Sequence, residues 1–126
     1  MSKQVRLSRL ELKVMEALWD RGACSVREVQ ESFPEKGRPA HNTVQTMLTR
    51  LEAKKAVRRA KKISNAHIYE AVITRAATQR VLVEELLAFF GGRAAPLISH
   101  LIDSGQLTTQ DVEEARKALK KGAKDE

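Results

Sequence analysis

Short polar side chains recur at helical spacing in residues 39–55, which read PAHNTVQTMLTRLEAKK. Amide, hydroxyl and guanidinium groups of this kind form hydrogen bonds with the base edges and phosphates of nucleic acids. The spacing therefore predicts a polar helix face that is able to contact a nucleic acid. For this segment taken alone, a solvent-exposed helix with an unusual threonine content is the default interpretation, and the neighbouring elements must decide between the two. The face comprises Asn42, Thr46 and Thr49, with Thr43, Gln45 and Arg50 beside them. His41, at the entry to the helix, is also expected to lie near the nucleic acid.

An apolar stripe on the same segment predicts how this polar face is positioned. Apolar residues at i, i+3, i+4 and i+7 are typical of a helix that is buried along one side, which turns its other side toward solvent. We expect the helix to begin with His41 or Asn42 near its N-cap and to run to about residue 55. The stripe consists of Val44, Met47, Leu48 and Leu51.

Two earlier helices are predicted by their N-terminal capping patterns. Residues 8–11 and 25–28 both have the form S-x-x-E, in which the hydroxyl and the carboxylate cap each other's backbone donors. Gly22 is placed to end the first helix, and Pro34 soon stops the second. A short basic arm is expected over residues 1–7.

A hairpin is predicted after the third helix. Val57–Lys61 and His67–Val72 have the composition of strands, and the intervening residues 62–66 form a loop with a basic tip. The order helix, helix, helix, hairpin is that of a winged helix-turn-helix domain, whose third helix enters the major groove of DNA while the hairpin lies along the backbone. We therefore predict a mostly α protein with a winged-helix domain over residues 1–75.

The charge distribution supports this prediction. The chain has a net charge of +7, with sixteen Lys or Arg against eight Asp or Glu in residues 1–75 and seven against eight in residues 76–126. A basic surface confined to one part raises the encounter rate with a polyanion and favours phosphate contacts. Double-stranded DNA is the expected partner, since an RNA-binding surface would need exposed stacking aromatics, which Tyr69 alone does not supply.

Enzymatic chemistry is not expected. His41, His67 and His100 lie in three separate elements without carboxylates or cysteines at metal-ligand spacing, so we predict no metal site and no cofactor. No phosphate-binding glycine loop, zinc-protease motif or nucleophile motif is present. The single cysteine, Cys24, excludes an internal disulfide and fits a cytoplasmic location, and no apolar run approaches the ~20 residues that span a membrane.

The C-terminal part, residues 76–126, is expected to dimerise. Three helices are predicted, over residues 76–90, within 93–105 and from Thr108 or Thr109 onward, and they carry more apolar surface than so short a segment can cover alone. A homodimer would cover it, and packing of these helices onto the first domain is the alternative. The expected dimerisation residues are Val81, Leu82, Leu86, Leu87, Phe90, Leu97, Ile98, Leu101, Ile102, Val112 and Leu119.

Four segments together resemble the BlaI/MecI penicillinase-repressor family: LSRLELKVMEALW, NTVQTMLTRLEAKKAV, IYEAV and LISHLIDSGQLTTQDVEEARKALKK. The resemblance implies a dimeric transcriptional repressor that binds palindromic operators of β-lactamase or related genes. It maps DNA contacts onto Asn42, Thr43, Gln45, Thr46 and Arg50 of the third helix, and onto Lys61, Lys62 and Ser64 or Asn65 of the wing. The family's better-known entry to this helix, Trp-Ser-Pro-Lys-Thr, is replaced by Pro-Ala-His-Asn-Thr at residues 39–43.

The same resemblance implies a switch, since family members are often inactivated by proteolysis in the dimerisation domain through a membrane sensor-protease. The corresponding bond joins His100 and Leu101. The chain has no C-terminal cysteine pair of the kind carried by copper-responsive relatives. The alternatives to an operator-specific, protease-linked repressor are a protein-interaction module and a general duplex-binding protein. An interaction module predicts an acidic or apolar face on the third helix.

Overall fold

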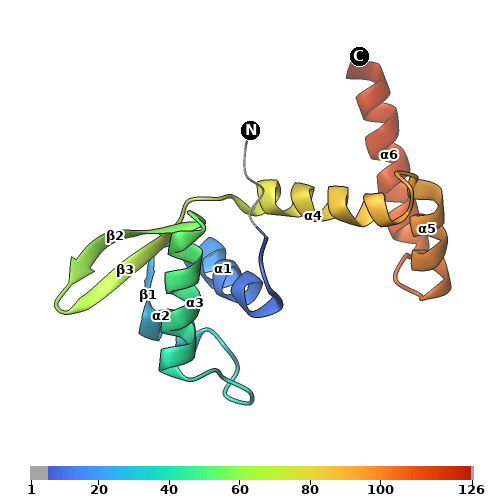
Figure 1. The fold of residues 1–126 in the computed structure, drawn as a ribbon. Helices are drawn as coiled ribbons and strands as arrows, with labels where there is room; N and C mark the ends of the chain where they lie inside the picture. The colour runs from blue at the N-terminus through green and yellow to red at the C-terminus, as the bar shows by residue number, and fades with distance from the viewer. Residues whose placement is uncertain (1–5, 126) are drawn as a thin grey trace. The chain divides into compact units, whose positions relative to one another are not determined.

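The computed structural model describes residues 6–125, so residues 1–5 of the predicted basic arm lie outside the described part of the chain. Figure 1 shows short helices and a small sheet, followed by three further helices. The order confirms the predicted mostly α winged-helix architecture with a helical C-terminal part. The elements are α1 (Arg9–Arg21), β1 (Cys24–Ser25), α2 (Val26–Glu31), α3 (His41–Ala53), β2 (Val57–Ile63), β3 (Ala66–Ala71), α4 (Arg75–Phe89), α5 (Ala94–Asp103) and α6 (Thr109–Asp125).

The core of the winged helix forms where α1, α2, α3 and the sheet meet. All four residues of the predicted α3 stripe are buried, and Leu48 and Leu51 are completely inaccessible. They pack in one cluster with Val14 and Met15 of α1. Burial of each such side chain contributes about 1.5–3 kcal/mol to folding, so the stripe fixes the rotation of α3 about its axis.

The sheet has three strands in the order β1-β3-β2, all antiparallel. The sequence did not predict β1, because this strand has only two residues and exists through the pairing of Cys24 with Tyr69 and of Ser25 with Ile68. The hairpin strands are also longer toward the tip than predicted. Ile63 pairs with Ala66, which leaves a two-residue turn in place of a five-residue loop.

The capping predictions were right for α1 and α2, and α3 begins at His41, next to its N-cap, as expected. Ser8 and Ser25 are N-caps, and each forms the complete capping box with the glutamate three residues later. The N-cap of α3 is Ala40, which makes no side-chain cap, so neither His41 nor Asn42 has that role. Consequently, no N-cap side chain occupies the amide end of this helix, which is the end that favours anions.

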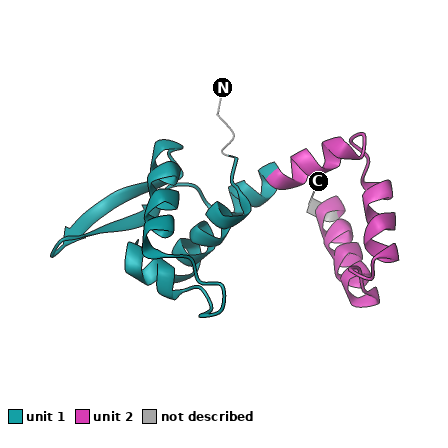
Figure 2. Ribbon diagram, turned by 60° about the horizontal axis from the view of Figure 1, so that its bottom comes forward, with its two compact units in different colours: residues 1–81 teal, residues 82–126 magenta. Residues whose placement is uncertain are grey.

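The chain divides into two compact units, residues 1–81 and 82–126, and the division falls within α4 (Figure 2). The first unit contains the winged helix, and the second contains the end of α4 together with α5 and α6. No residue from 82 to 123 is buried. No helix among the described residues is both long and apolar enough to cross a membrane. The domain boundary at residue 75 stays a prediction.

An ion pair links the C-terminal end of α3 to the first turn of α1. Lys54, at the C-terminal end of α3, places its Nζ 2.8 Å from Oε1 and 2.9 Å from Oε2 of Glu11, and it also donates to the carbonyl oxygen of Arg6 at 2.8 Å. Glu11 is only 3% exposed. Burial alone raises the pKa of this carboxyl, but hydrogen bonds from Lys54 and from Ser8 outweigh burial and lower the pKa overall.

This ion pair predicts a pH-dependent loss of stability in Lys54→Met. At pH 7 the variant leaves a buried carboxylate without its cation, which we expect to lower the free energy of unfolding by about 1–3 kcal/mol. Because the folded-state pKa of Glu11 is lowered, its contribution is present above the ordinary glutamate pKa of about 4.3 and is lost as the pH falls through the folded-state value. The difference between the two proteins should therefore narrow in acid.

Urea denaturation of both proteins at several pH values measures this difference. The control is Lys55→Met, which removes the exposed neighbouring lysine. Equal losses of stability in the two variants at pH 7 would contradict the assignment.

Candidate nucleic-acid interface

The outer face of α3 carries the residues that the sequence predicted to contact a nucleic acid. Six of them are exposed, whereas Gln45 is only half-exposed. Since Val44, Leu48 and Leu51 are buried on the other side, the exposed polar groups share one face of the helix. A helix of this width fits the major groove of DNA. The exposed residues are His41, Asn42, Thr43, Thr46, Thr49 and Arg50.

Two of the three threonines of this face make internal hydrogen bonds. The hydroxyl of Thr46 donates to the carbonyl oxygen of Asn42 at 2.9 Å, and that of Thr49 donates to the carbonyl oxygen of Gln45 at the same distance. Hydroxyls on helices commonly bond the carbonyl four residues earlier. Both side chains are thereby held in fixed rotamers on the exposed face. The spacing that placed them on this face does not reveal these bonds.

Gln45 points away from the exposed face and toward the sheet. Its Nε2 lies 3.4 Å from the hydroxyl of Tyr69, a fully buried residue of β3. This contact joins the middle of α3 to the strand that supports the wing. Its predicted contact with DNA stays a prediction, and the structure additionally gives it a position between helix and sheet.

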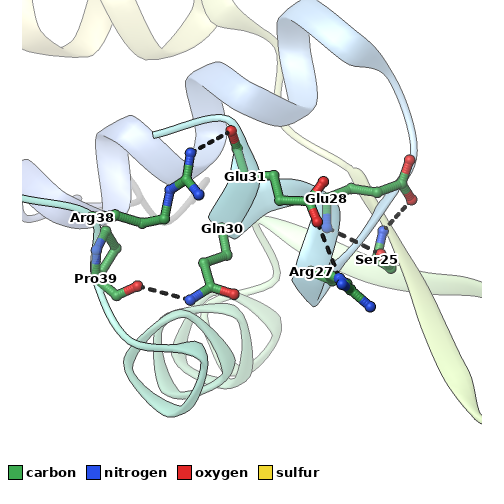
Figure 3. Close-up of polar contacts among 7 residues, drawn as sticks. All are labelled: Ser25, Arg27, Glu28, Gln30, Glu31, Arg38 and Pro39. Carbon is green, nitrogen blue, oxygen red and sulfur yellow. Dashed lines mark hydrogen bonds and ion pairs between the residues drawn. The ribbon is translucent and has the colours of Figure 1, made fainter. Parts of the chain in front are cut away.

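The turn that leads into α3 is fastened to α2 by side chains (Figure 3). Gln30 donates from Nε2 to the carbonyl oxygen of Pro39 at 3.1 Å. The guanidinium of Arg38 donates to the carbonyl oxygen of Phe33 at 2.8 Å and to that of Glu31 at 3.3 Å. These bonds fix the start of α3 relative to α2, so the departure from the better-known family sequence lies in an ordered turn.

The wing, which is the hairpin of β2 and β3, carries two arginines that are paired with carboxylates and two lysines that are not paired within the described part of the chain. Arg58 forms an ion pair with Glu70, and Arg59 pairs with Glu52 at 3.1 Å. Lys61 and Lys62 are exposed and form no ion pair within the described residues. A register shift between Arg59 and Lys61 separates the two groups, and a bulge of this kind increases the local twist of a strand.

The tip of the wing is exposed as predicted. Ser64 has a φ of 54°, a left-handed conformation that closes the two-residue turn with Asn65. The Ser64 hydroxyl, the Asn65 amide and the two unpaired lysines are therefore exposed at the tip of the wing.

A hollow of about 310 Å³ lies between the starts of α2 and α3 and the wing. Its lining includes Asn65, which the family resemblance gave as an alternative to Ser64, and two polar side chains that were not predicted, Arg27 and His67. They come together with His41 only because the hairpin folds back beside the helices, so no local spacing signals them. Arg27 is already engaged with Glu31 at 3.0 Å. The lining is completed by Ser25, Val26, Gln45 and Ala66.

The described residues contain no group of three His, Cys, Asp or Glu side chains that could hold a metal ion. Cys24 is buried, and its thiol donates to the carbonyl oxygen of Gly22 at 3.3 Å. Burial raises the pKa of this thiol and the charge of Glu28 raises it further, against a smaller opposing effect of Arg21. The thiolate form that redox chemistry needs is therefore disfavoured.

The predicted dimerisation residues lie on α4, α5 and α6, and they are largely accessible. Exposed fractions are 43% for Leu82, 43% for Leu86 and 56% for Ile102, and reach 75% for Leu119. Val112 and Ile98 are also exposed, whereas the remaining members are half-buried, namely Val81, Leu87, Phe90, Leu97 and Leu101. Two further apolar residues of α4, Val83 and Phe89, are also exposed.

The predicted cleavage bond lies within α5. His100 is exposed and its ring packs edge-on against that of Phe90, with centroids 5.5 Å apart. The carbonyl oxygens of His100 and Leu101 accept hydrogen bonds from the amides of Ser104 and Gln106, at 3.0 and 2.9 Å. The bond is therefore held in helical structure.

Comparison with known proteins gives a consistent result. The profile of the Penicillinase_R family, described as penicillinase repressor, matches residues 7–121. A penicillinase repressor of Staphylococcus aureus is 25% identical over 122 residues, which is 94% of each chain. The solved DNA-binding domain of the repressor BlaI is 28% identical and superposes with a TM-score of 0.52, covering 61% of this chain and 93% of that domain.

A second solved relative is Bacillus licheniformis BlaI in its monomeric form, in complex with the blaP half-operator. It is 28% identical with a TM-score of 0.50, again over 61% of this chain and 93% of that one. These relatives are repressors, not enzymes, in agreement with the sequence prediction. Since the family profile spans nearly the whole described sequence, this chain belongs to the penicillinase repressor family.

Proposed function

We propose that this chain is a cytoplasmic transcriptional repressor that binds a palindromic DNA operator of β-lactamase or related genes as a homodimer. The observation that carries the proposal is the exposed polar face of α3, which occurs together with exposed lysines of the wing that no carboxylate of the described residues pairs. The solved BlaI relative bound to a half-operator supports an equivalent use of this surface here. The face is neither acidic nor apolar, which disfavours a protein-interaction module.

In the proposed complex, α3 makes the base contacts, and phosphate contacts come from the wing and from the start of α3. Asn42, Thr46, Thr49 and Arg50 face the base edges of one major groove, and Arg50 can form a bidentate contact with guanine. Lys61 and Lys62 neutralise phosphates beside the groove, since their charges are not cancelled by neighbouring carboxylates. His41 and Thr43 lie at the uncapped amide end of α3, where a phosphate is favoured.

Homodimerisation is proposed because the second unit lacks an interior of its own. Its apolar residues remain 43–89% exposed at eight positions from Leu82 to Leu119, whereas those of the winged-helix core are at most 8% exposed. A second copy would cover this surface and would provide a two-fold protein for a two-fold operator.

We propose derepression by proteolysis of the bond between His100 and Leu101, and this cleavage requires that α5 first unfolds locally. Proteases bind extended backbone, whereas this bond is helical and its carbonyls are hydrogen-bonded. Opening of α5 must therefore precede cleavage, and a helix in a unit without buried residues opens at low cost in free energy. The partner that cuts would be a membrane sensor-protease.

Two substitutions distinguish contacts with the bases from contacts with the phosphates. Arg50→Ala should weaken binding to an operator selected from genomic fragments by about 1–3 kcal/mol and should leave binding to unrelated duplex nearly unchanged. Lys62→Ala should weaken both alike and should reduce the salt dependence by about one phosphate contact. Fluorescence anisotropy at several salt concentrations measures both effects, with Lys117→Ala in α6 as control.

A wild-type footprint from Arg50→Ala would exclude the assigned base contact. Equal affinity of the wild-type protein for all duplexes would instead indicate a general DNA-binding protein.

A single charged substitution tests the proposed dimer interface. Ile102→Glu places a charge in the proposed apolar interface and should weaken self-association on the order of 100-fold, as burial of an unpaired charge costs about 3 kcal/mol or more. The exposed Gln106→Glu, which adds the same charge near the end of α5, should leave association unchanged. Sedimentation equilibrium gives the association constants, and a wild-type monomer at micromolar concentration would refute the proposed homodimer.

Cleavage of the bond between His100 and Leu101 can be tested in cells. In cells of the source organism exposed to a β-lactam, mass spectrometry should detect a fragment that begins at Leu101 and a matching decrease in full-length protein. Ser99→Pro, which disrupts α5 and leaves both residues of the bond unchanged, should be cut faster by added protease because proline interrupts helical hydrogen bonds. Derepression with the chain intact would contradict the proteolytic switch.

A further inference from the structure

The segment between β3 and α4 is not a free linker. The amides of Val72 and Ile73 donate to the carbonyl oxygen of Ala56 at 2.8 and 3.3 Å. The carbonyl oxygen of Ile73 accepts a hydrogen bond from the indole Nε1 of Trp19 at 3.0 Å, and the Ile73 side chain packs against the winged-helix core. The chain is therefore fastened to α1 and to the sheet up to the residue before Thr74.

The first residue of α4 continues this attachment. The guanidinium carbon of Arg75 lies 5.4 Å from the centroid of the Trp19 ring, which is the geometry of a cation–π contact. Arg75 also forms an ion pair with Asp20, the neighbour of Trp19 on α1. Two adjacent residues at the end of α1 thus hold one side chain at the start of α4 by two different interactions.

The first turn of α4 is also fixed internally. The hydroxyl of Thr74 accepts a hydrogen bond from the amide of Ala77 at 3.1 Å, and the hydroxyl of Thr78 donates to the carbonyl oxygen of Thr74 at 2.9 Å. Thr78 is the buried residue of α4, at 7% exposure. The helix then continues to Phe89 without a glycine or a proline, the residues at which helices usually kink.

We propose that Trp19, Asp20 and Arg75 are positioning residues that fix the direction in which α4 leaves the DNA-binding unit. All three lie within the first compact unit, so the arrangement is a property of that unit alone. In a dimer joined through the second unit, this direction sets the distance between the two α3 helices and therefore the half-site spacing that is bound. The inference rests on the proposed dimeric repressor.

Half-site spacing gives a readout that a purely structural role would not change. Affinity is measured for duplexes with one half-site and for duplexes whose two half-sites are separated by increasing numbers of base pairs. If the direction of α4 is fixed as proposed, the wild-type protein should prefer one spacing by at least about tenfold. Arg75→Ala and Trp19→Phe should reduce this preference to about twofold and keep the affinity for one half-site.

Arg80→Ala is the matched control, since it removes an exposed arginine of the same helix. Arg75→Lys, which keeps the cation beside Asp20, should retain more spacing preference than Arg75→Ala. Because Trp19 is the single tryptophan, its emission reports the contact without DNA, and it should change in Arg75→Ala but not in Arg80→Ala.

An unchanged spacing profile in Trp19→Phe and Arg75→Ala, at unchanged half-site affinity, would overturn the proposal. If Arg75→Ala does not fold, the profile of Trp19→Phe decides, because the phenyl ring preserves most of the packing and removes only the N–H donor. Absence of half-site binding by the wild-type protein would refute the proposed function itself, which is a different outcome.

Discussion

Burial of one stripe on α3 is the constraint on which the rest of the DNA-binding unit depends. Val44, Leu48 and Leu51 are at most 1% exposed and contact the same cluster as Val14 and Met15. A helix turns by 100° per residue, so rotating α3 by one position would expose part of this stripe and bury polar groups. The residues available to DNA are therefore selected by the residues that must be buried.

On the wing, ion pairs among the described residues determine which positive charges remain without a neighbouring carboxylate. The strands carry four cations close together in sequence, but carboxylates of α3 and β3 neutralise the two that lie nearest the core. The positive charge that remains is concentrated beyond the register shift at Arg59/Lys61, toward the tip. The sequence is enough to give the sign of the net charge. Only the fold shows where on the wing the positive charge without a paired carboxylate lies.

Features with a local physical cause were predictable from the sequence. The capping boxes at Ser8 and Ser25, the apolar stripe of α3 and the hairpin all arise from residues a few positions apart. The sequence missed β1 and the contact between Gln45 and Tyr69, because each depends on groups that are distant in sequence. The same reason hides the contacts of Trp19 with Ile73 and Arg75, which are separated by more than fifty positions.

In the proposed complex with DNA, the internal hydrogen bonds of Thr46 and Thr49 restrict the groups that these two side chains can contact. A hydroxyl that gives its proton to the helix backbone has only lone pairs left for a partner, so it acts as an acceptor. In the major groove the donors are the amino groups of adenine and cytosine, while guanine and thymine present acceptors. The middle of α3 is thus chemically suited to adenine or cytosine, and Arg50, a pure donor, is suited to guanine on the same helix face.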